Sequence, residues 1–567
     1  MITMNKKLLL SVVLLAACII ARAQTTFLPL GSDDYHLLDR LETMSGRLSD
    51  TLCQTDKPES RKRTIAFLQQ SDTANKALSA VDRYDMQQMI SENGEWTADG
   101  NGAIDSKHPV FNTFYKKQYD FFYVKTNDFF LVIDPVMSLQ GLKETGGSSL
   151  LQTNSRGFEA RGWISKKIGF YTSCTGNNEM TPAFITSYIN SRKAVPGNDY
   201  YIYRNSDYNY LQASGYFDFA VVKNHLNMTF GYGKNFIGDG ITSVFLSDFS
   251  SSYPYLKFTT HIWKFNYQNL FVRLTPQFAN RNGELPHRFT TFHQLSLNVT
   301  KWLNIGFFEA VVSGHYDTYD IGYMNPIIYY RALEQSNGSP DNELIGYSMK
   351  AIVLKRLQLY GQFLFDEFKP KDFFSNDGFW ANKWAMQMGA KYFNAFTIKN
   401  LDLQAEMNIV RPYTYSHYDT IANYTNYNQP LANPLGSGFE QLIGIARYEP
   451  VRNLTVSVTG MYYIKGADTG KINYGNNMFL NYNTRKSDYG VGNINGVKTN
   501  CTSLELNASY QLRRNLFIDL GATQRNFKSD YKGIISSSTG TSVGNISTTY
   551  YYLGIRLNAA RRSYNFF

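Results

Sequence analysis

The feature that most constrains this chain is the regular alternation of short and long connections between runs of residues that alternate apolar and polar. We find eighteen such runs, and the even-numbered ones are followed by tight, mostly basic turns. These turns are Ser165-Lys166-Lys167, Lys223-Asn224, Thr300-Lys301, Lys355-Arg356, Lys399-Asn400, Arg452-Asn453 and Arg513-Arg514. The odd-numbered runs are followed by longer connections, from about 10 to over 30 residues. This alternation predicts an up-and-down antiparallel meander whose two rims differ.

Each run has the period of two that is typical of a strand with one apolar and one polar face. In one run, Leu401, Leu403, Ala405, Met407 and Ile409 alternate with Asp402, Gln404, Glu406 and Asn408. A length of about ten residues with this pattern suits a strand between lipid and a polar lumen. The runs start near residues 128, 155, 167, 211, 225, 253, 265, 288, 302, 343, 357, 384, 400, 438, 453, 501, 515 and 548.

Composition supports a transmembrane barrel. Aromatic residues make up 15% of the chain and charged residues 18%, and the mean hydropathy of −0.34 excludes a helical membrane protein. Closing the sheet also removes the exposed edges of an open meander. We therefore predict an all-β transmembrane protein, an outer-membrane β-barrel of about eighteen antiparallel strands within residues 111–567. A terminal Phe567 suits recognition by the barrel-assembly machinery.

The N-terminal region has a different pattern. Residues 1–23 have the basic start, the apolar core and the small-residue cleavage site of a secretory signal peptide. A lipoprotein signal at Cys18 is the alternative, although the apolar run continues beyond it. Residues 24–110 contain three short amphipathic helix patterns, at 37–48, 58–68 and 78–90. We predict a periplasmic helical segment that docks on the barrel base, or a purely structural cap.

Three stretches resemble a known family: residues 26–42 (TFLPL, then YHLLDRLE), 233–256 (GKNFIGDG, then SD and YPYL) and 323–342 (YMNP, then GSPDN). They resemble the Wzi-like capsule-assembly proteins, particularly the branch that includes the gliding-motility protein RemB. The resemblance covers nearly the whole mature chain. It implies an 18-stranded outer-membrane barrel with a periplasmic helical bundle, which holds capsular or other exopolysaccharide at the cell surface. Many relatives have an Arg-Ser pair after the GDG turn, but Ile241-Thr242-Ser243 stands here, so that arginine's role does not carry over.

A glycan site needs aromatic faces for sugar rings and polar groups for hydroxyls, on loops held by a rigid scaffold. Three external loops, 314–342, 411–438 and 466–499, carry such residues, and we expect the ligand at the last two. Our candidate ligand contacts are Tyr413, Tyr415, Tyr424, Tyr427, Asn428, Tyr474, Tyr482 and Arg485. The alternative is that these tyrosines belong to the aromatic girdle of the rim or to packing between loops.

The connection 314–342 follows the ninth strand and is rich in tyrosine. We predict that it folds inward as a lid over the barrel mouth, with Arg331 and Glu334 about one helical turn apart. The candidate lid and lumen residues are Tyr323, Asn325, Arg331, Glu334, Asp341 and Asn342. Six carboxylates are expected to face the lumen: Asp218, Asp366, Asp402, Glu406, Glu505 and Asp519. They suit either a selective pore or a hydrogen-bonded, plugged interior, and the inward lid favours the plugged interior.

These features favour binding or anchoring of surface polysaccharide as the function. The alternatives are a passive porin or substrate-specific channel, and a structural surface protein of gliding motility. We expect no enzyme, because His293 and Ser296 point to opposite faces of a strand and Ser313 with His315 has no orienting carboxylate. We expect no cofactor and no metal site, since Cys53, Cys174 and Cys501 lack ligand spacing. The expected partners are surface polysaccharide, outer-membrane lipid or glycolipid and the barrel-assembly machinery. We expect no binding of nucleic acid. We also expect the protein to be a monomer in the outer membrane.

Overall fold

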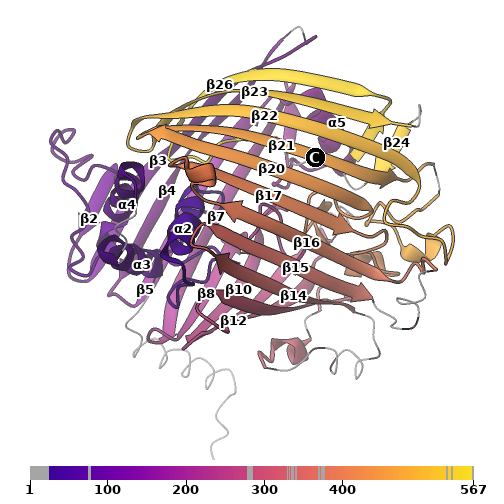
Figure 1. Cartoon of the computed structure of the whole chain (residues 1–567), viewed down its shortest axis with the longest axis horizontal. Coiled ribbons are helices and arrows are strands. Elements are labelled where there is room, and N and C mark those ends of the chain that lie inside the picture. The colour runs from indigo at the N-terminus through magenta and orange to yellow at the C-terminus, as the bar shows by residue number, and fades with distance from the viewer. Residues whose placement is uncertain are drawn as a thin grey trace, which may run out of the picture.

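The computed structural model describes residues 25–564 apart from 75–77, 148, 277–284, 319, 328–329, 331–332, 334–337, 339–340, 368–370, 372–376, 471, 531–533 and 538–539. The signal-peptide prediction and Phe567 therefore lie outside the described residues. Eighteen long antiparallel strands form a closed barrel, which confirms the predicted fold class (Figure 1). The last strand pairs with the first, Leu553 opposite Gly141, so the sheet closes on itself.

The eighteen strands begin within a few residues of the predicted starts. They are β3 (Phe129–Glu144), β4 (Leu150–Ile164), β5 (Ile168–Glu179), β7 (Asp207–Val222), β8 (Leu226–Gly233), β10 (Tyr253–Ile262), β11 (Phe265–Leu274), β12 (Arg288–Asn298), β13 (Leu303–Val312), β14 (Asn342–Val353), β15 (Leu357–Glu367), β16 (Lys383–Tyr392), β17 (Leu401–Val410), β20 (Phe439–Val451), β21 (Leu454–Ala467), β22 (Val497–Arg513), β23 (Leu516–Ser529) and β26 (Ile546–Leu557).

The remaining elements are short. Two extend the barrel sheet, β2 (Phe122–Lys125) and β6 (Ile202–Arg204), and the other short strands form the pairs β1 (Asp56–Lys57) with β9 (Phe236–Ile237), β18 (Thr425–Asn426) with β19 (Gln429–Pro430), and β24 (Ile534–Ser537) with β25 (Gly540–Val543). The helices are α2 (Asp34–Ser45), α3 (Arg61–Ala74), α4 (Ala80–Glu92), α5 (Ala183–Arg192) and the 3-10 turns η1 (Gly94–Trp96), η2 (Ile321–Met324), η3 (Ala395–Thr397), η4 (Thr420–Ala422) and η5 (Tyr482–Thr484). Among the described residues, no helix is both long and apolar enough to cross a membrane.

The two rims differ as the alternation predicts, with two departures. The first link of the long-loop rim, 145–149, is short, because β3 ends at Glu144 and β4 begins at Leu150. The turn around Lys399-Asn400 is longer than a tight turn because η3 widens it. The Asn394 side chain in this turn accepts a hydrogen bond from Arg40 of α2 (2.8 Å), so the extra residues meet the N-terminal segment.

The polar strand faces point inward. All six carboxylates predicted to face the lumen are buried. Glu406, for example, accepts hydrogen bonds from the Ile241 amide (2.6 Å) and from the hydroxyl groups of Thr242 (2.7 Å) and Tyr360 (3.0 Å). Outward positions on the same strands carry exposed apolar side chains, such as Leu442, Leu504 and Leu553. The interior is therefore packed and hydrogen-bonded.

Three segments from the long-loop rim fill the interior, and we call them together the plug: 180–199 with α5, 234–252, and 411–438. Their apolar side chains join inward-facing strand residues in one continuous buried core. Ile189 of α5, Phe245 and Leu431 are each completely buried. The lumen is therefore occupied by a hydrophobic core that the plug segments and the strands form together. The plugged interior is as predicted, but these three segments form it.

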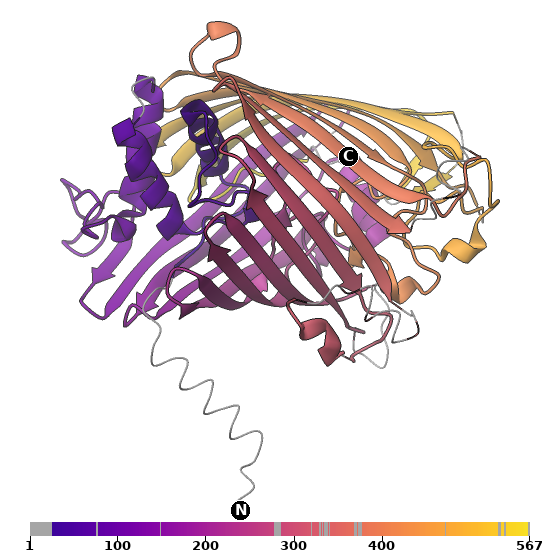
Figure 2. The same ribbon diagram turned by 60° about the horizontal axis from the view of Figure 1, so that its bottom comes forward.

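The N-terminal segment fills the opposite end, where the short turns lie, as the views from two directions agree (Figures 1 and 2). The three predicted helices are present as α2, α3 and α4. The segment reaches the plug: β1 pairs with β9, and Thr55 donates to Asp239 (3.0 Å). Lys391 of β16 bridges Asp39 of α2 (2.6 Å) and the Asp239 carbonyl (2.7 Å). The lumen is thus filled continuously from rim to rim.

The C-terminal tail behind β26 turns back into the lumen. Arg561 forms an ion pair with Glu505 of β22 (2.6 Å), and Arg562 forms one with Glu179 of β5 (3.1 Å). Tyr564 is buried and also bonds Glu179. The tail explains why the alternating pattern ends at Leu557.

Candidate functional site

Four of the predicted glycan contacts are buried. Tyr415 and Tyr424 stack with 5.5 Å between ring centroids and donate to the carbonyl oxygens of Val244 (2.8 Å) and Phe245 (2.7 Å). Tyr413 donates to the Asn473 carbonyl (3.1 Å), and Tyr427 is also buried. These rings hold the plug together, so a ligand reaches them only if the loops move.

Two further candidates, Asn428 and Tyr474, are partly exposed but lie apart. The Asn428 side chain donates to the carbonyl of Arg192 at the end of α5 (3.0 Å). The Tyr474 amide donates to Asp468 (2.8 Å), and Lys486 lies 5.1 Å from the Tyr474 ring centroid. Asn428 fastens its loop to the end of α5, whereas these contacts of Tyr474 lie within its own loop, so the two residues do not form a common surface.

The last two candidates, Tyr482 and Arg485, do come together, in an aromatic group at the long-loop rim. We call it the rim cluster: Phe379, Trp380, His417, Tyr418, Tyr482, Arg485, Asp488 and Tyr489, in which Phe379 joins Tyr489 to Trp380. The Tyr482 ring lies 4.7 Å from Trp380, 5.8 Å from His417 and 6.2 Å from Tyr418, measured between centroids. Tyr418 and Tyr489 are 41% and 56% exposed, so the group presents open ring surface.

Charged groups lie directly beside these rings. The Arg485 guanidinium sits 4.2 Å from the Trp380 ring centroid, and its Nε donates to Asp488 at 2.6 Å. The Lys383 ammonium lies 5.0 Å from the Tyr482 ring centroid. Stacked guanidinium groups and partly exposed carboxylates bind hydroxyl groups, while the ring faces accept the C–H faces of sugars. The group therefore has the chemistry of a saccharide surface.

Backbone hydrogen bonds hold the rim cluster rigid. Segment 377–382 pairs with segment 488–491: the Trp380 amide donates to the Asp488 carbonyl (2.8 Å) and the Val491 amide to the Gly378 carbonyl (2.9 Å). Gly378 adopts a left-handed conformation (φ 70°), and a Cβ there would lie 2.9 Å from the Val491 nitrogen. Glycine is therefore required at this close approach.

Burial and the neighbouring Lys383 lower the pKa of His417 to about 4, so its imidazole is neutral at ordinary pH. Burial raises the pKa of Tyr482. The neutral imidazole of His417 therefore lies beside the Tyr418 ring, and Lys383 lies next to the cluster.

Sequence reasoning missed Trp380, His417, Tyr418, Asp488 and Tyr489. Trp380 lies in the link 368–382, which carries no run of tyrosine or asparagine. The other four lie inside the two candidate loops, next to the predicted ligand contacts. The Phe379-Trp380 pair just before β16 was the available signal, since adjacent large aromatic residues in a polar link need a packing partner.

The connection 314–342 lies elsewhere than predicted. Its described residues Tyr323 and Tyr330 pack on the outward face of the wall. The Tyr330 amide donates to Glu309 (2.8 Å), and its hydroxyl group meets His293 and the Tyr323 carbonyl oxygen. His293 and Glu309 are opposite one another in the β12–β13 ladder and lie on the face opposite to the luminal Phe292 and Phe308.

The remaining lid and lumen candidates are distributed between that wall and the plug. Asp341 accepts from the Tyr323 hydroxyl (2.6 Å), and Asn325 is exposed. Asn342 reaches the plug, where it donates to the Ala422 carbonyl (3.0 Å). Arg331 and Glu334 lie outside the described residues. The described part of this connection therefore covers the outside of the barrel, and the mouth is closed by the plug.

No protein-family model and no curated protein sequence matches this chain. Among solved structures, the fold is similar to that of Wzi from Escherichia coli, described as an outer membrane protein involved in group 1 capsule assembly and a carbohydrate-binding β-barrel. The TM-score is 0.56 at 12% identity, over 95% of this chain and 100% of that chain. OprD from Pseudomonas aeruginosa matches with a TM-score of 0.41 at 14% identity, over 75% of this chain and 93% of that chain. The chain thus has a Wzi-like fold, an 18-stranded closed barrel.

Proposed function

We propose that the protein is an outer-membrane barrel that binds surface polysaccharide through the rim cluster and so anchors capsule or exopolysaccharide at the cell surface. The observation that carries this proposal is the rigid, partly exposed group of Trp380, Tyr418, Tyr482 and Arg485 above a closed lumen. The fold likeness to a carbohydrate-binding barrel supports it. So does the earlier resemblance to Wzi-like proteins, including their RemB-like branch.

The proposal includes an orientation. Outer-membrane barrels have short periplasmic turns and long external loops. The rim cluster then faces the outside, and α2, α3 and α4 face the periplasm. The plug favours anchoring over the alternative of a passive porin, because the described part of the lumen is occupied by a core of buried side chains such as Phe245 and Leu431.

Binding of purified full-length protein to polysaccharide released from the surface of the parent cells tests the proposal. We expect wild-type protein in detergent micelles to retain the polysaccharide, and Tyr482→Ala and the pair Tyr418→Ala/Tyr489→Ala to weaken binding about tenfold or more, because each removes a stacking face. Tyr551→Ala is the matched control, since Tyr551 is exposed on the outward face of β26 and does not belong to the rim cluster.

Failure of wild-type protein to bind any polysaccharide fraction would refute the proposal, as would equal binding by the rim variants and the control. A deletion strain separates the motility alternative. Loss of capsule staining supports anchoring, whereas impaired movement with normal staining supports a structural role in gliding.

A further inference from the structure

The barrel wall has a gap near its long-loop rim. Strand β7 pairs with β5 from Tyr208 to Phe219, but on its other side β8 pairs only from Gly215 onward. Strand β6 pairs with β7 at Asp207–Asn209. In the ladders of the described strands, residues 210–214 of β7 therefore have a partner on one side only. An otherwise closed sheet is interrupted at this point.

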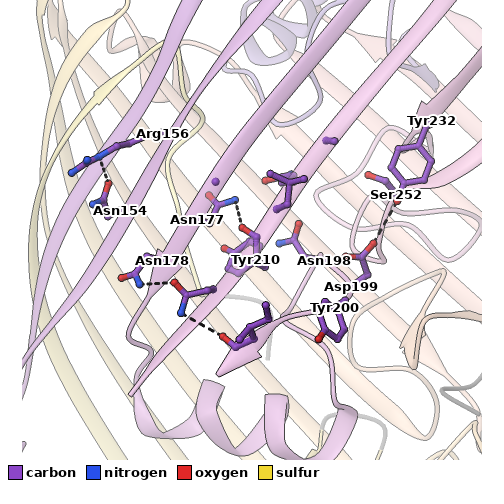
Figure 3. Close-up of a pocket in the computed structure, with 16 residues that line it drawn as sticks. Asn154, Arg156, Asn177, Asn178, Asn198, Asp199, Tyr200, Tyr210, Tyr232 and Ser252 are labelled. Carbon is purple, nitrogen blue, oxygen red and sulfur yellow. Dashed lines mark hydrogen bonds between the residues drawn. The ribbon is translucent and has the colours of Figure 1, made fainter. Parts of the chain in front are cut away.

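A cavity of about 750 Å³ occupies the gap (Figure 3). Asn154, Arg156 and Asn178 line it from the outward face of β4 and β5, while Tyr210 and Asn198 line it from the luminal side. Tyr210 points into the lumen, where it donates a hydrogen bond to Glu179 (2.8 Å). Asn178 is the residue next to Glu179 on the same strand, so its side chain points to the outward face. The cavity therefore extends through the wall and opens toward the outside of the barrel.

The lining has the chemistry of a saccharide site. It contains six carboxamide side chains: Asn154, Asn177, Asn178, Asn198, Asn209 and Gln212. Each carboxamide both donates and accepts hydrogen bonds, as sugar hydroxyl groups require. Tyr200, Tyr210 and Tyr232 supply ring surface, and Figure 3 shows their side chains around the same space.

Existing hydrogen bonds orient these groups. The Asn178 amide donates to Asn209 (2.8 Å) and to Asp207 (3.0 Å), and the Arg156 guanidinium donates to Asn154 (3.0 Å). Arg156 is only partly engaged, because a guanidinium group has five N–H donors. It lies on the outward face at the edge of the cavity, where it can bind a phosphate group bidentately.

The wall next to the cavity is apolar on its outward face. Leu211, which lines the cavity, is 62% exposed, and Phe217 and Phe230 below it are also exposed. A strand edge without its ladder partner is tolerated at the polar headgroup level of a membrane but not in its hydrocarbon core. The gap therefore lies where a lipid's headgroup meets its acyl chains.

We infer that this gap binds the phosphorylated sugar headgroup of an outer-leaflet glycolipid, whose acyl chains lie against Leu211 and Phe217. The carboxamides hold the sugar hydroxyl groups, Arg156 binds the phosphate, and the tyrosines flank the rings. The inference rests on the proposed outer-membrane location. It uses none of the rim cluster, so the barrel would hold lipid-anchored and free glycans at separate places.

Full-length protein reconstituted in nanodiscs containing lipopolysaccharide tests the inference, with bound glycolipid counted by native mass spectrometry. We expect wild-type protein to retain about one molecule that survives exchange into phosphatidylcholine nanodiscs, and Arg156→Gln to lose about tenfold in retention. Ala213→Trp, which fills the outward side of the cavity, should abolish retention. Leu553→Trp is the matched control on the exposed face of β26, and heat-modifiable migration on gels confirms folding of each variant.

Two comparisons separate the possible sources of binding. Inorganic phosphate and the deacylated sugar headgroup should compete poorly; equal competition by either would show that the acyl chains play no part and would overturn the inference. Retention by folded Ala213→Trp equal to that of Leu553→Trp would also overturn it, as would displacement by an extended peptide in place of the lipid.

A further pair of variants distinguishes the two proposals. Tyr482→Ala should retain glycolipid normally, and Ala213→Trp should still bind polysaccharide at the rim. If polysaccharide binding fails for every variant but glycolipid retention follows the predicted pattern, the proposed function fails and the inference stands. If Tyr482→Ala loses glycolipid as Ala213→Trp does, the separate site is refuted.

Discussion

The Phe245 ring lies flat against the Phe308 ring inside the barrel, with 4.4 Å between centroids and 5° between planes. Phe245 belongs to the plug segment 234–252 and Phe308 to the inner face of β13, and both are completely buried. Gly346 on the adjoining β14 leaves the room for this contact, because a Cβ there would lie 2.4 Å from a Phe245 ring carbon. The stack therefore fixes the plug to the wall at a position shaped for it.

Phe245→Ala should destabilise the barrel. Removing a fully buried phenyl ring from a packed core costs about 3–5 kcal/mol, because the lost transfer energy is joined by the cost of the cavity. The measurement is the temperature at which the heat-modifiable band shifts on gels. Phe396→Ala is the control, since Phe396 is exposed in the turn before β17. Equal midpoints for the two variants would show that the stack contributes little.

The plug predicts the electrical behaviour of the barrel. Wild-type protein in planar bilayers should show no steady conductance, because buried side chains fill the lumen from rim to rim. Replacing residues 414–432 with a short glycine–serine linker removes Tyr415, Tyr424 and Leu431. It should produce brief channel openings in place of a steady open state, because the N-terminal segment still fills the other end of the lumen. Large, steady wild-type currents without ligand would contradict the plugged interior and support a porin.

Arg40 connects the N-terminal segment to the wall. Its guanidinium bonds Asp82 of α4 (2.7 Å) and Asp402 of β17 (2.5 Å), and all three side chains are buried. Arg40→Ala leaves two buried carboxylates without their cation and should cost about 3–5 kcal/mol. Arg40→Lys should be intermediate, because an ammonium group lacks the fork that reaches both partners.

Limited proteolysis together with the thermal midpoint measures this effect, since release of α2 from the barrel exposes it to protease. Arg47→Ala is the control, because Arg47 is exposed just beyond the end of α2. If Arg40→Ala and Arg47→Ala resist protease equally, the ion pairs do not hold the segment in place.

The sequence predicts the wall well because the alternation of apolar and polar residues is a local signal. Each strand start, from Phe129 to Ile546, follows from a period of two and from the turns beside it. The contacts that hold the plug are not local in the sequence. Tyr415 and Tyr424 lie in a stretch whose composition is typical of an exposed loop. They lie in the interior, where they donate hydrogen bonds to the carbonyl oxygens of Val244 and Phe245, more than a hundred residues away.

The same reason explains the partial success at the candidate site. The aromatic and basic content of loop 466–499 predicts Tyr482 and Arg485, but Trp380 joins them only through backbone pairing between segments 377–382 and 488–491. The tyrosines of the connection 314–342 predict a position inside the barrel, which the structure does not bear out. Tyr330 of this connection instead bonds His293 and Glu309, two polar residues on the outward face of the wall. The alternation of strand residues predicts apolar side chains on that face, so it does not predict these contacts.

Asp56 makes stability depend on pH. Burial is the main cause that raises its pKa to about 7, with the neighbouring Asp239 adding to it, whereas its ordinary value is 3.8. Between these two values the folded state binds a proton that the unfolded state releases. The stabilisation is complete below about pH 4 and is lost as pH rises through about 7, at up to about 1.4 kcal/mol per pH unit.

Asp56→Asn should therefore flatten this dependence and raise the thermal midpoint at pH 8 relative to wild type, because the amide stays neutral at every pH. At pH 4 the two proteins should differ little, since Asp56 is then protonated in the folded state. Thermal midpoints at pH 4, 6 and 8 check this, with Asp50→Asn, at an exposed position, as the matched control. A wild-type midpoint that rises from pH 4 to 8, with Asp56→Asn following it, would show that other groups dominate and that Asp56 is ionised in its buried position beside Asp239.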